Sequence, residues 1–428
     1  MSKSTLLDHV YRHEKNLAQQ VFLTQPTGGG QVATYTWAQT MDQARRMATH
    51  LQSQGLPPGA KVGILSKNCA HFFMAELAIW MAGYTTVAIF PTENADTIRY
   101  VLEHSESSLL FVGKLDTWPD QAPGVPEGVP CIAMPLAPAT PFQRWDDIVA
   151  KTSPMTGEPH RSANDLAMLM YTSGSTGQPK GVMHNFGRIC DVAQGIFEFL
   201  ENDQGPGKQH RMLSYLPLAH VFERAWVECG SLVDGNTHLY FAESLDTFLQ
   251  DLNRARPTTF ISVPRIWLKF QQGVFAKMPA QKLDRLLRIP LLNRLVGKKV
   301  LKGLGLDQVR LAGSGSAPIP AEVTNETQAQ ALAKALNHAI RLAGGASRSS
   351  TADQFFGASP SRRSYPATPV TGSVFHVVSL DDAVALMRTR LEREPGSFSN
   401  VNPTAPEAAG LPQIPLQGSP LQVTLPGD

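Results

Sequence analysis

The sequence has few cysteines, and their spacing excludes most metal and disulfide scaffolds. Its 428 residues contain four cysteines, far apart and without a C-x-x-C pair: Cys69, Cys131, Cys190 and Cys229. A structural zinc site needs clustered Cys or His ligands, and a disulfide framework needs many cysteines in a short chain. We therefore expect neither, which fits a reducing cytoplasm.

Neither sign of charge is in excess. The chain has 38 Lys and Arg and 36 Asp and Glu, a net charge of +2. A balanced chain lacks the broad basic surface that is typical of nucleic-acid binding, so no nucleic-acid partner is predicted. The N-terminus also lacks the apolar segment of a signal peptide.

Long apolar runs are rare, and the longest one needs an explanation. Residues 71–90 approach the ~20 apolar residues of a membrane-spanning helix. However, Glu76 lies inside this run, Gly83 interrupts it, and β-branched residues follow. A buried helix over 70–82 and a buried strand over 85–90 explain the pattern better than a membrane span does.

What the sequence has is an alternation of strand and helix patterns over its first three quarters. Thr40 and Gln43 form a capping-box pattern, followed by an apolar helical stripe that stops at Gly55. Another helix is expected over 95–104, and 116–162 is expected to be irregular. Strands are predicted over 62–65, 85–90, 109–112, 166–171, 212–216, 239–241, 260–263 and 309–312. This order predicts an α/β fold with mostly parallel, doubly wound sheets.

The composition changes near residue 324. All six tryptophans precede that point. A helix is expected over 325–343, a Ser/Ala/Pro-rich linker over 346–373, and a Pro-rich, partly disordered end after 395. We therefore divide the chain into a large domain over 1–323, a helix of uncertain origin over 324–345 and an atypical tail over 346–428.

The strongest motif is YTSGSTGQPKGV, residues 171–182. A buried strand leads into small residues whose N–H groups and hydroxyls can surround phosphate oxygens, and Lys180 adds a positive charge. It is not a Walker A loop, because Pro179 stands where that motif needs Gly. The candidate phosphate-binding residues are Thr172, Ser173, Gly174, Ser175, Thr176, Gly177 and Lys180.

A second motif, LSYLPLAHVFER, covers residues 213–224 and centres on His220. A His between two apolar residues is more often a core residue than a functional one. His220 and Glu223 have no further His at helical spacing, so zinc ligation is not predicted. Trp226 follows, either as a core aromatic residue or as part of a binding pocket.

Together these motifs resemble the AMP-forming adenylating enzymes, the superfamily of acyl-CoA synthetases, luciferases and peptide-synthetase adenylation domains. The resemblance runs from about Tyr35 to Val323 and is strongest to bacterial long-chain fatty acid–CoA ligases. It is supported by ISVPRIW (261–267) and LAGSGSAPIP (311–320). The latter is similar to the family's adenine loop, which implies nucleotide contacts at Gly315, Ser316, Ala317 and Pro318.

The resemblance implies a large N-terminal domain that uses ATP, Mg²⁺ and coenzyme A. A fatty carboxylate would attack the α-phosphorus of ATP, and the coenzyme A thiol would then displace AMP. His220 takes the catalytic role at the acyl and adenylate pocket, which Trp226 would line. The expected partners are these small molecules, in the cytoplasm. Contact with the inner face of a membrane is an alternative for which no amphipathic signature is predicted.

Three family features do not occur in this sequence. They are the Y-G-x-T-E segment with its magnesium-binding Glu, the T-G-D segment with its ribose-binding Asp, and the C-terminal domain with its catalytic Lys. No metal ligand is therefore assigned. The chain looks like a ligase domain cut short and joined to unrelated sequence. Two alternatives stay open: a non-catalytic nucleotide- or acyl-binding remnant or fusion product, and an adenylating ligase for another carboxylic acid.

Overall fold

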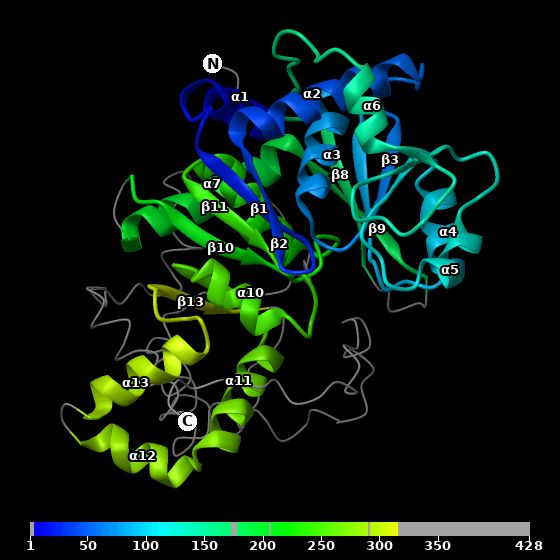
Figure 1. Ribbon diagram of the computed structural model, residues 1–428. Coiled ribbons are helices and arrows are strands. Elements are labelled where there is room, and N and C mark those ends of the chain that lie inside the picture. Colours follow the sequence, from blue (N-terminus) through cyan, green and yellow to red (C-terminus); the bar gives the residue numbers. More distant parts are fainter. Residues whose placement is uncertain (1–3, 173–177, 205–206, 290–291, 316–428) are drawn as a thin grey trace, which may run out of the picture. The chain divides into compact units, whose positions relative to one another are not determined.

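The computed structural model describes residues 4–172, 178–204, 207–289 and 292–315 (Figure 1). These residues form two units, one up to Asp251 and one from Leu252. The predictions for the helix at 325–343 and for the tail lie outside the described residues.

A seven-stranded sheet contains most of the parallel strands of the first unit. All of its neighbouring strands pair in parallel except the last two, which are antiparallel. In order across the sheet they are β7 (Gln143–Arg144), β6 (Cys131–Ala133), β5 (Ser107–Val112), β3 (Lys61–Leu65), β4 (Thr85–Ile89), β8 (Leu166–Thr172) and β9 (Lys180–Asn185). The central strands are continuous buried runs, as expected for a sheet covered on both faces.

A second, four-stranded sheet lies in the same unit. Its strands are β10 (His210–Ser214), β11 (Thr237–Phe241), β1 (Val21–Gly28) and β2 (Gln31–Thr36), of which only β2 is antiparallel to its neighbour. Gly29 and Gly30, with φ of 58° and 79°, form the tight turn before β2. A two-residue turn of type I′ needs positive φ at both positions, which explains the glycine run.

Helix α3 (Ala70–Met81) contacts strands of both sheets (Figure 1). All twelve of its residues are buried, and β4 follows it directly. The interpretation of residues 71–90 as a buried helix and strand is therefore correct. Among the helices of the described residues, none is both long and apolar enough to cross a membrane.

The remaining helices of the first unit surround these sheets. They are α1 (Leu6–Asn16), α2 (Trp37–Ser53), α4 (Ala95–His104), α5 (Trp118–Gln121), η1 (Ala122–Gly124), α6 (Trp145–Lys151), α7 (Phe186–Gln204), α8 (Val221–Glu223), the π-helix η2 (Arg224–Cys229), and α9 (Gly230–Asp234). Helix α10 (Phe248–Ala255) contains the boundary between the two units.

The second unit has a parallel pair of strands, β12 (Thr259–Ser262) and β13 (Leu311–Ser314). Three helices connect them in the chain: α11 (Pro264–Lys277), α12 (Ala280–Arg288) and α13 (Leu292–Gly303). Pro264 begins α11, where its missing N–H costs no hydrogen bond.

Several expectations about local structure were wrong. The capping box of α2 is formed by Thr36 and Gln39, and Thr40 is a buried residue inside that helix. The predicted irregular region 116–162 contains β6, β7 and α6, which extend the large sheet and cover it. Strands β1, β2 and β9 were not predicted, because they alternate too weakly or contain Pro and Gly.

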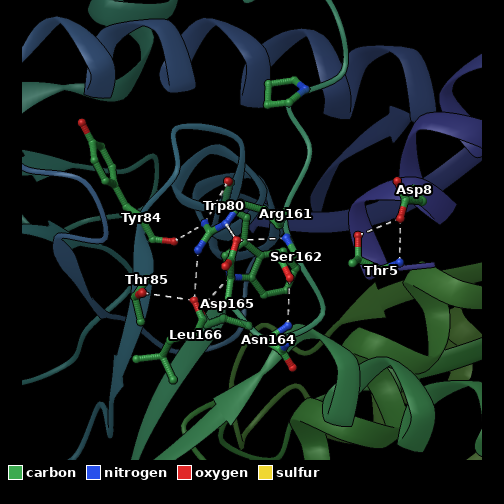
Figure 2. A network of polar contacts seen from close by, with 12 residues as sticks. Thr5, Asp8, Trp80, Tyr84, Thr85, Arg161, Ser162, Asn164, Asp165 and Leu166 are labelled. Atoms are coloured by element: carbon green, nitrogen blue, oxygen red, sulfur yellow. Dashed lines mark hydrogen bonds and ion pairs between the residues drawn. The ribbon is translucent and has the colours of Figure 1, made fainter. Parts of the chain in front are cut away.

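Arg161 fixes the start of β8, the strand that leads to the phosphate-loop motif (Figure 2). Its guanidinium donates to the carbonyl oxygens of Trp80, Tyr84 and Leu166 at 3.3, 2.8 and 3.2 Å. It also pairs with Asp165 at 3.1 Å and is only 8% exposed. One buried side chain therefore joins the end of α3, the approach to β4 and the first residue of β8.

Candidate functional site

The phosphate-loop motif includes the end of β8 and the start of β9, which pair in antiparallel fashion as a hairpin. Thr172, the last residue of β8, lies directly opposite Lys180, the first residue of β9. Both are exposed, and they flank residues 173–177, which lie outside the described residues. The hairpin therefore presents a hydroxyl and an ammonium group on either side of the predicted phosphate-binding segment.

An aromatic and polar cluster supports this hairpin from α4. The Tyr100 hydroxyl donates to the carbonyl oxygen of Pro179 at 3.1 Å, and His104 Nδ1 lies 2.8 Å from the Tyr171 hydroxyl. A Cβ added at Gly181 would come within 3.3 Å of the Tyr171 ring, so the Gly after Lys180 permits close packing. Nothing in the local sequence pattern indicated this role for His104.

Asn68 links the carboxyl ends of the two sheets. It follows β3 of the seven-stranded sheet, and its amide donates to Ser214 Oγ at 2.8 Å and to the Leu216 carbonyl at 2.7 Å, just after β10. Lys114, after β5, donates to the carbonyl oxygen of Ala242 at 3.1 Å, just after β11. Ligands of open α/β sheets bind outside the carboxyl ends of the strands. The hairpin and the His220 segment both follow such ends.

Glu223 fastens the segment that carries His220. Its Oε1 accepts from Ser214 Oγ at 2.8 Å, the Tyr215 N–H at 3.0 Å and the Asn68 amide at 3.2 Å. The side chain is 1% exposed, and burial raises its pKa to about 8. Because all three donors converge on Oε1, the other oxygen is the one that would carry the proton. The spacing of His220 and Glu223 raised only the question of metal ligation, whereas the structure gives Glu223 this fastening role.

His220 is held in one tautomer by its own backbone turn. It caps α8, and its Nδ1 accepts from the Phe222 N–H at 3.1 Å. A backbone N–H can only donate, so Nδ1 carries no proton and Nε2 does. Burial lowers the pKa of His220 below its ordinary 6.5, which keeps the ring neutral at physiological pH. It is thus a neutral donor through Nε2.

Behind this segment, one buried cation lies between two buried acids. Arg224 donates to Glu76 of α3 and, at 2.7 Å, to Glu228. All three are at most 1% exposed, and the Arg224 guanidinium lies 5.0 Å from the Phe72 ring centroid. Burial raises the pKa of Glu76 well above its ordinary value. Since one cation cannot balance two buried anions, burial favours the protonated form of Glu76 in this cluster.

Of the other predicted site residues, Trp226 and Gly315 are described by the structure and three are not. Trp226 lies in η2, is 3% exposed and packs edge-on against Phe199 with ring centroids 6.3 Å apart. That packing is typical of a core residue. Gly315 follows β13 in the second unit, and its N–H donates to the Ser262 carbonyl at 3.1 Å. Ser316, Ala317 and Pro318 lie outside the described residues.

A magnesium site held by the protein would need oxygen ligands, chiefly carboxylates, that converge on one point. In the ranges that the structure describes, no group of three His, Cys, Asp or Glu side chains could hold a metal ion. The described residues therefore do not form a protein-held site for Mg²⁺.

Comparison with solved structures identifies the class of fold. The adenylation domain of a Segniliparus rugosus carboxylic acid reductase, in complex with AMP and a carboxylic acid, superposes with a TM-score of 0.62 at 19% identity. The superposition covers 77% of this chain and 58% of the reductase chain. An anthranilate CoA ligase in complex with anthranoyl-AMP gives 0.61 at 20% identity, over 78% and 58%. The expected α/β fold, that of the N-terminal domain of adenylating enzymes, is therefore correct.

The sequence comparisons identify the family. The model of the AMP-binding enzyme family matches residues 10–339, so the chain belongs to that family. Long chain acyl-CoA synthetase 5 of Arabidopsis thaliana is 27% identical over 69% of this chain and 50% of its own length. A rat long-chain-fatty-acid–CoA ligase is 27% identical over 68% and 50%. The chain thus spans about half the length of the curated relatives it matches.

Proposed function

We propose that this chain is the nucleotide- and acid-binding domain of an AMP-forming ligase that activates a long-chain fatty acid for transfer to coenzyme A. The observation that carries the proposal is the β8–β9 hairpin, in which Thr172 and Lys180 face each other across the phosphate-loop motif. In this proposal they hold the β- and γ-phosphates of ATP together with residues 173–177. The long-chain preference rests on the motif around His220 and on the names of the relatives.

His220 supplies a fixed donor in this proposal. Its Nε2–H would bind an oxygen of the fatty carboxylate or of the acyl-adenylate, at a site where a neutral donor stabilises developing charge without a proton transfer. The lowered pKa keeps that donor in the same state above pH 6.5. Trp226 would line the acyl pocket from the core side.

Acid-dependent exchange between ATP and pyrophosphate tests the proposal on this chain. With Mg²⁺ and palmitate, we expect exchange that falls about 100-fold in Lys180→Ala, the usual loss when one charge-stabilising donor is removed. Lys151→Ala removes an exposed lysine of α6, outside the motif, and should leave exchange unchanged.

Two other results would favour different functions. Exchange that requires an aryl acid such as benzoate and ignores palmitate would make the chain an adenylating domain for another acid class. A folded chain that binds ATP through Lys180, as titration calorimetry would detect, but shows no exchange with either acid would be a nucleotide-binding domain without the chemistry. Absence of both ATP binding and exchange would overturn the proposal.

A further inference from the structure

A strongly basic segment lies in the second unit of a chain that is otherwise slightly acidic. Residues 277–302 contain eight Lys or Arg and one Asp, a net charge of +7. Because the whole chain carries +2, the remaining residues carry a net negative charge. The net charge of the full chain therefore conceals a local excess of positive charge, because an average over the full length cancels it.

Most of this segment lies in two helices, α12 and α13, which pack against each other and are here called the basic hairpin. Lys282 and Arg285 are exposed on α12, whereas Leu283 is fully buried. On α13 the buried side contains Val300 and Leu301, at 4% and 2% exposure. Both helices thus have an inner apolar side and an outer basic side.

The outer side of the basic hairpin carries exposed apolar residues in addition to its basic ones. Of the eight large hydrophobic residues that are exposed among the described residues, three lie between 289 and 295: Ile289, Leu292 and Leu295, at 45%, 38% and 67% exposure. On a helix of 3.6 residues per turn, Leu295 shares its face with the exposed Lys298, Lys299 and Lys302, three, four and seven residues later. Exposed leucines between lysines are unusual on a face that meets only water.

We propose that the basic hairpin docks on the surface of a membrane that contains anionic phospholipids. Its lysines and arginines complement the phosphate groups, and Leu292 and Leu295 enter the boundary between headgroups and acyl chains. Interfacial helices combine these two features, a cationic face and exposed apolar side chains on the same side. A nucleic acid would use the charge but would gain nothing from buried leucines.

Vesicle co-sedimentation of the full chain tests this proposal. We expect binding to vesicles of phosphatidylcholine mixed with phosphatidylglycerol, weakened by added salt, and little binding to pure phosphatidylcholine. Each lysine removed should weaken binding about fivefold, so Lys298→Gln with Lys302→Gln should lose about 25-fold. Leu295→Ser should weaken it about tenfold through the lost apolar burial.

The chain offers matched controls for both substitutions. Leu245→Ser removes another exposed leucine, at 55% exposure, and Lys151→Gln removes another exposed lysine. Both lie in the first unit and should leave vesicle binding unchanged. Circular dichroism spectra of all variants should match that of the parent chain.

Three results would overturn the proposal. The first is that the folded chain binds neither type of vesicle. The second is that Leu295→Ser leaves lipid binding intact while the lysine substitutions abolish it, which would indicate a general polyanion site. The third is that Leu295→Ser changes only the oligomeric state, which would make this face an interface between copies of the chain. Since no substrate is present, none of these results bears on the proposed ligase activity.

Discussion

At the scale of single residues, Glu223 is a buried acid whose protonation is coupled to folding. Burial raises its pKa from the ordinary 4.5 to about 8, so the folded chain binds this proton more tightly than the unfolded chain does. The stability it contributes is therefore complete below about pH 4.5 and is lost as the pH rises through 8. Each unit of pKa shift corresponds to roughly 1.4 kcal/mol.

Glu223→Gln should remove this pH dependence. The Gln carbonyl oxygen can accept from Ser214, Tyr215 and Asn68 without titrating, so we expect the variant to gain stability relative to the parent chain between pH 5 and pH 8. Urea unfolding followed by tryptophan fluorescence measures it, since five of the six tryptophans lie in the first unit.

Other acids with a raised pKa, such as Glu76 and Asp234, are present in both the variant and the parent chain. Their contribution to the pH dependence of stability therefore cancels in the comparison. Glu127→Gln, at an exposed position, is the control and should follow the parent curve. A constant difference between Glu223→Gln and the parent across this pH range would show that Glu223 is ionised in the fold.

The hydrogen-bond partners of single residues are what the sequence predicts least well. His220 could be selected from its motif, but its tautomer depends on the N–H of Phe222, which only the turn at α8 brings into reach. Glu223 accepts from Asn68, 155 positions away in the chain. Local patterns contain no information about a partner at that separation.

At the scale of elements, β8 connects the motif to the rest of the molecule, and Arg161 anchors its first residue (Figure 2). Arg161→Ala would leave three buried carbonyl oxygens without this donor. Hydrogen bonds to a charged group contribute about 1.5–3 kcal/mol each, only partly additive, so we expect a loss of about 3 kcal/mol in the free energy of unfolding. Chemical denaturation measures it.

Two further variants serve as a conservative substitution at the same site and as a control at an exposed site. Arg161→Lys keeps the charge but cannot reach several carbonyls with a planar fork, so an intermediate loss is expected. Arg144→Ala removes an arginine from an exposed pair with Asp146 and should cost under about 1 kcal/mol. Equal stability of Arg161→Ala and Arg144→Ala would contradict the anchoring role.

Helices and strands with a clear local pattern of apolar residues were predicted well, and those that depend on distant partners were not. Helix α4 was predicted with its observed bounds, and β3, β4 and β5 within two residues of theirs, because buried parallel strands are apolar throughout. Strand β9 is different. Its exposed Val182 and Met183, preceded by Gly181, give no alternation, and it forms because β8 offers a free edge.

At the scale of the whole molecule, α3 is the element through which the two sheets of the first unit share one core. It has no exposed residue, and it packs against strands of both sheets. Opening it would expose both sheets at once, whereas the exposed β9 can separate from β8 alone. Elements of the first kind open only in global unfolding, and elements of the second kind open locally.

We therefore expect a wide spread of amide exchange rates within the first unit. Peptides covering 70–81 should exchange last, at rates set by the free energy of global unfolding, and peptides covering 180–185 should exchange much earlier. Hydrogen–deuterium exchange with mass spectrometry measures both in one experiment. Adding denaturant below the unfolding transition should speed exchange in α3 steeply and in β9 only slightly, because m-values scale with the surface exposed on opening. Equal protection of α3 and β9 would mean that the unit opens as one block and that α3 has no special place in its core.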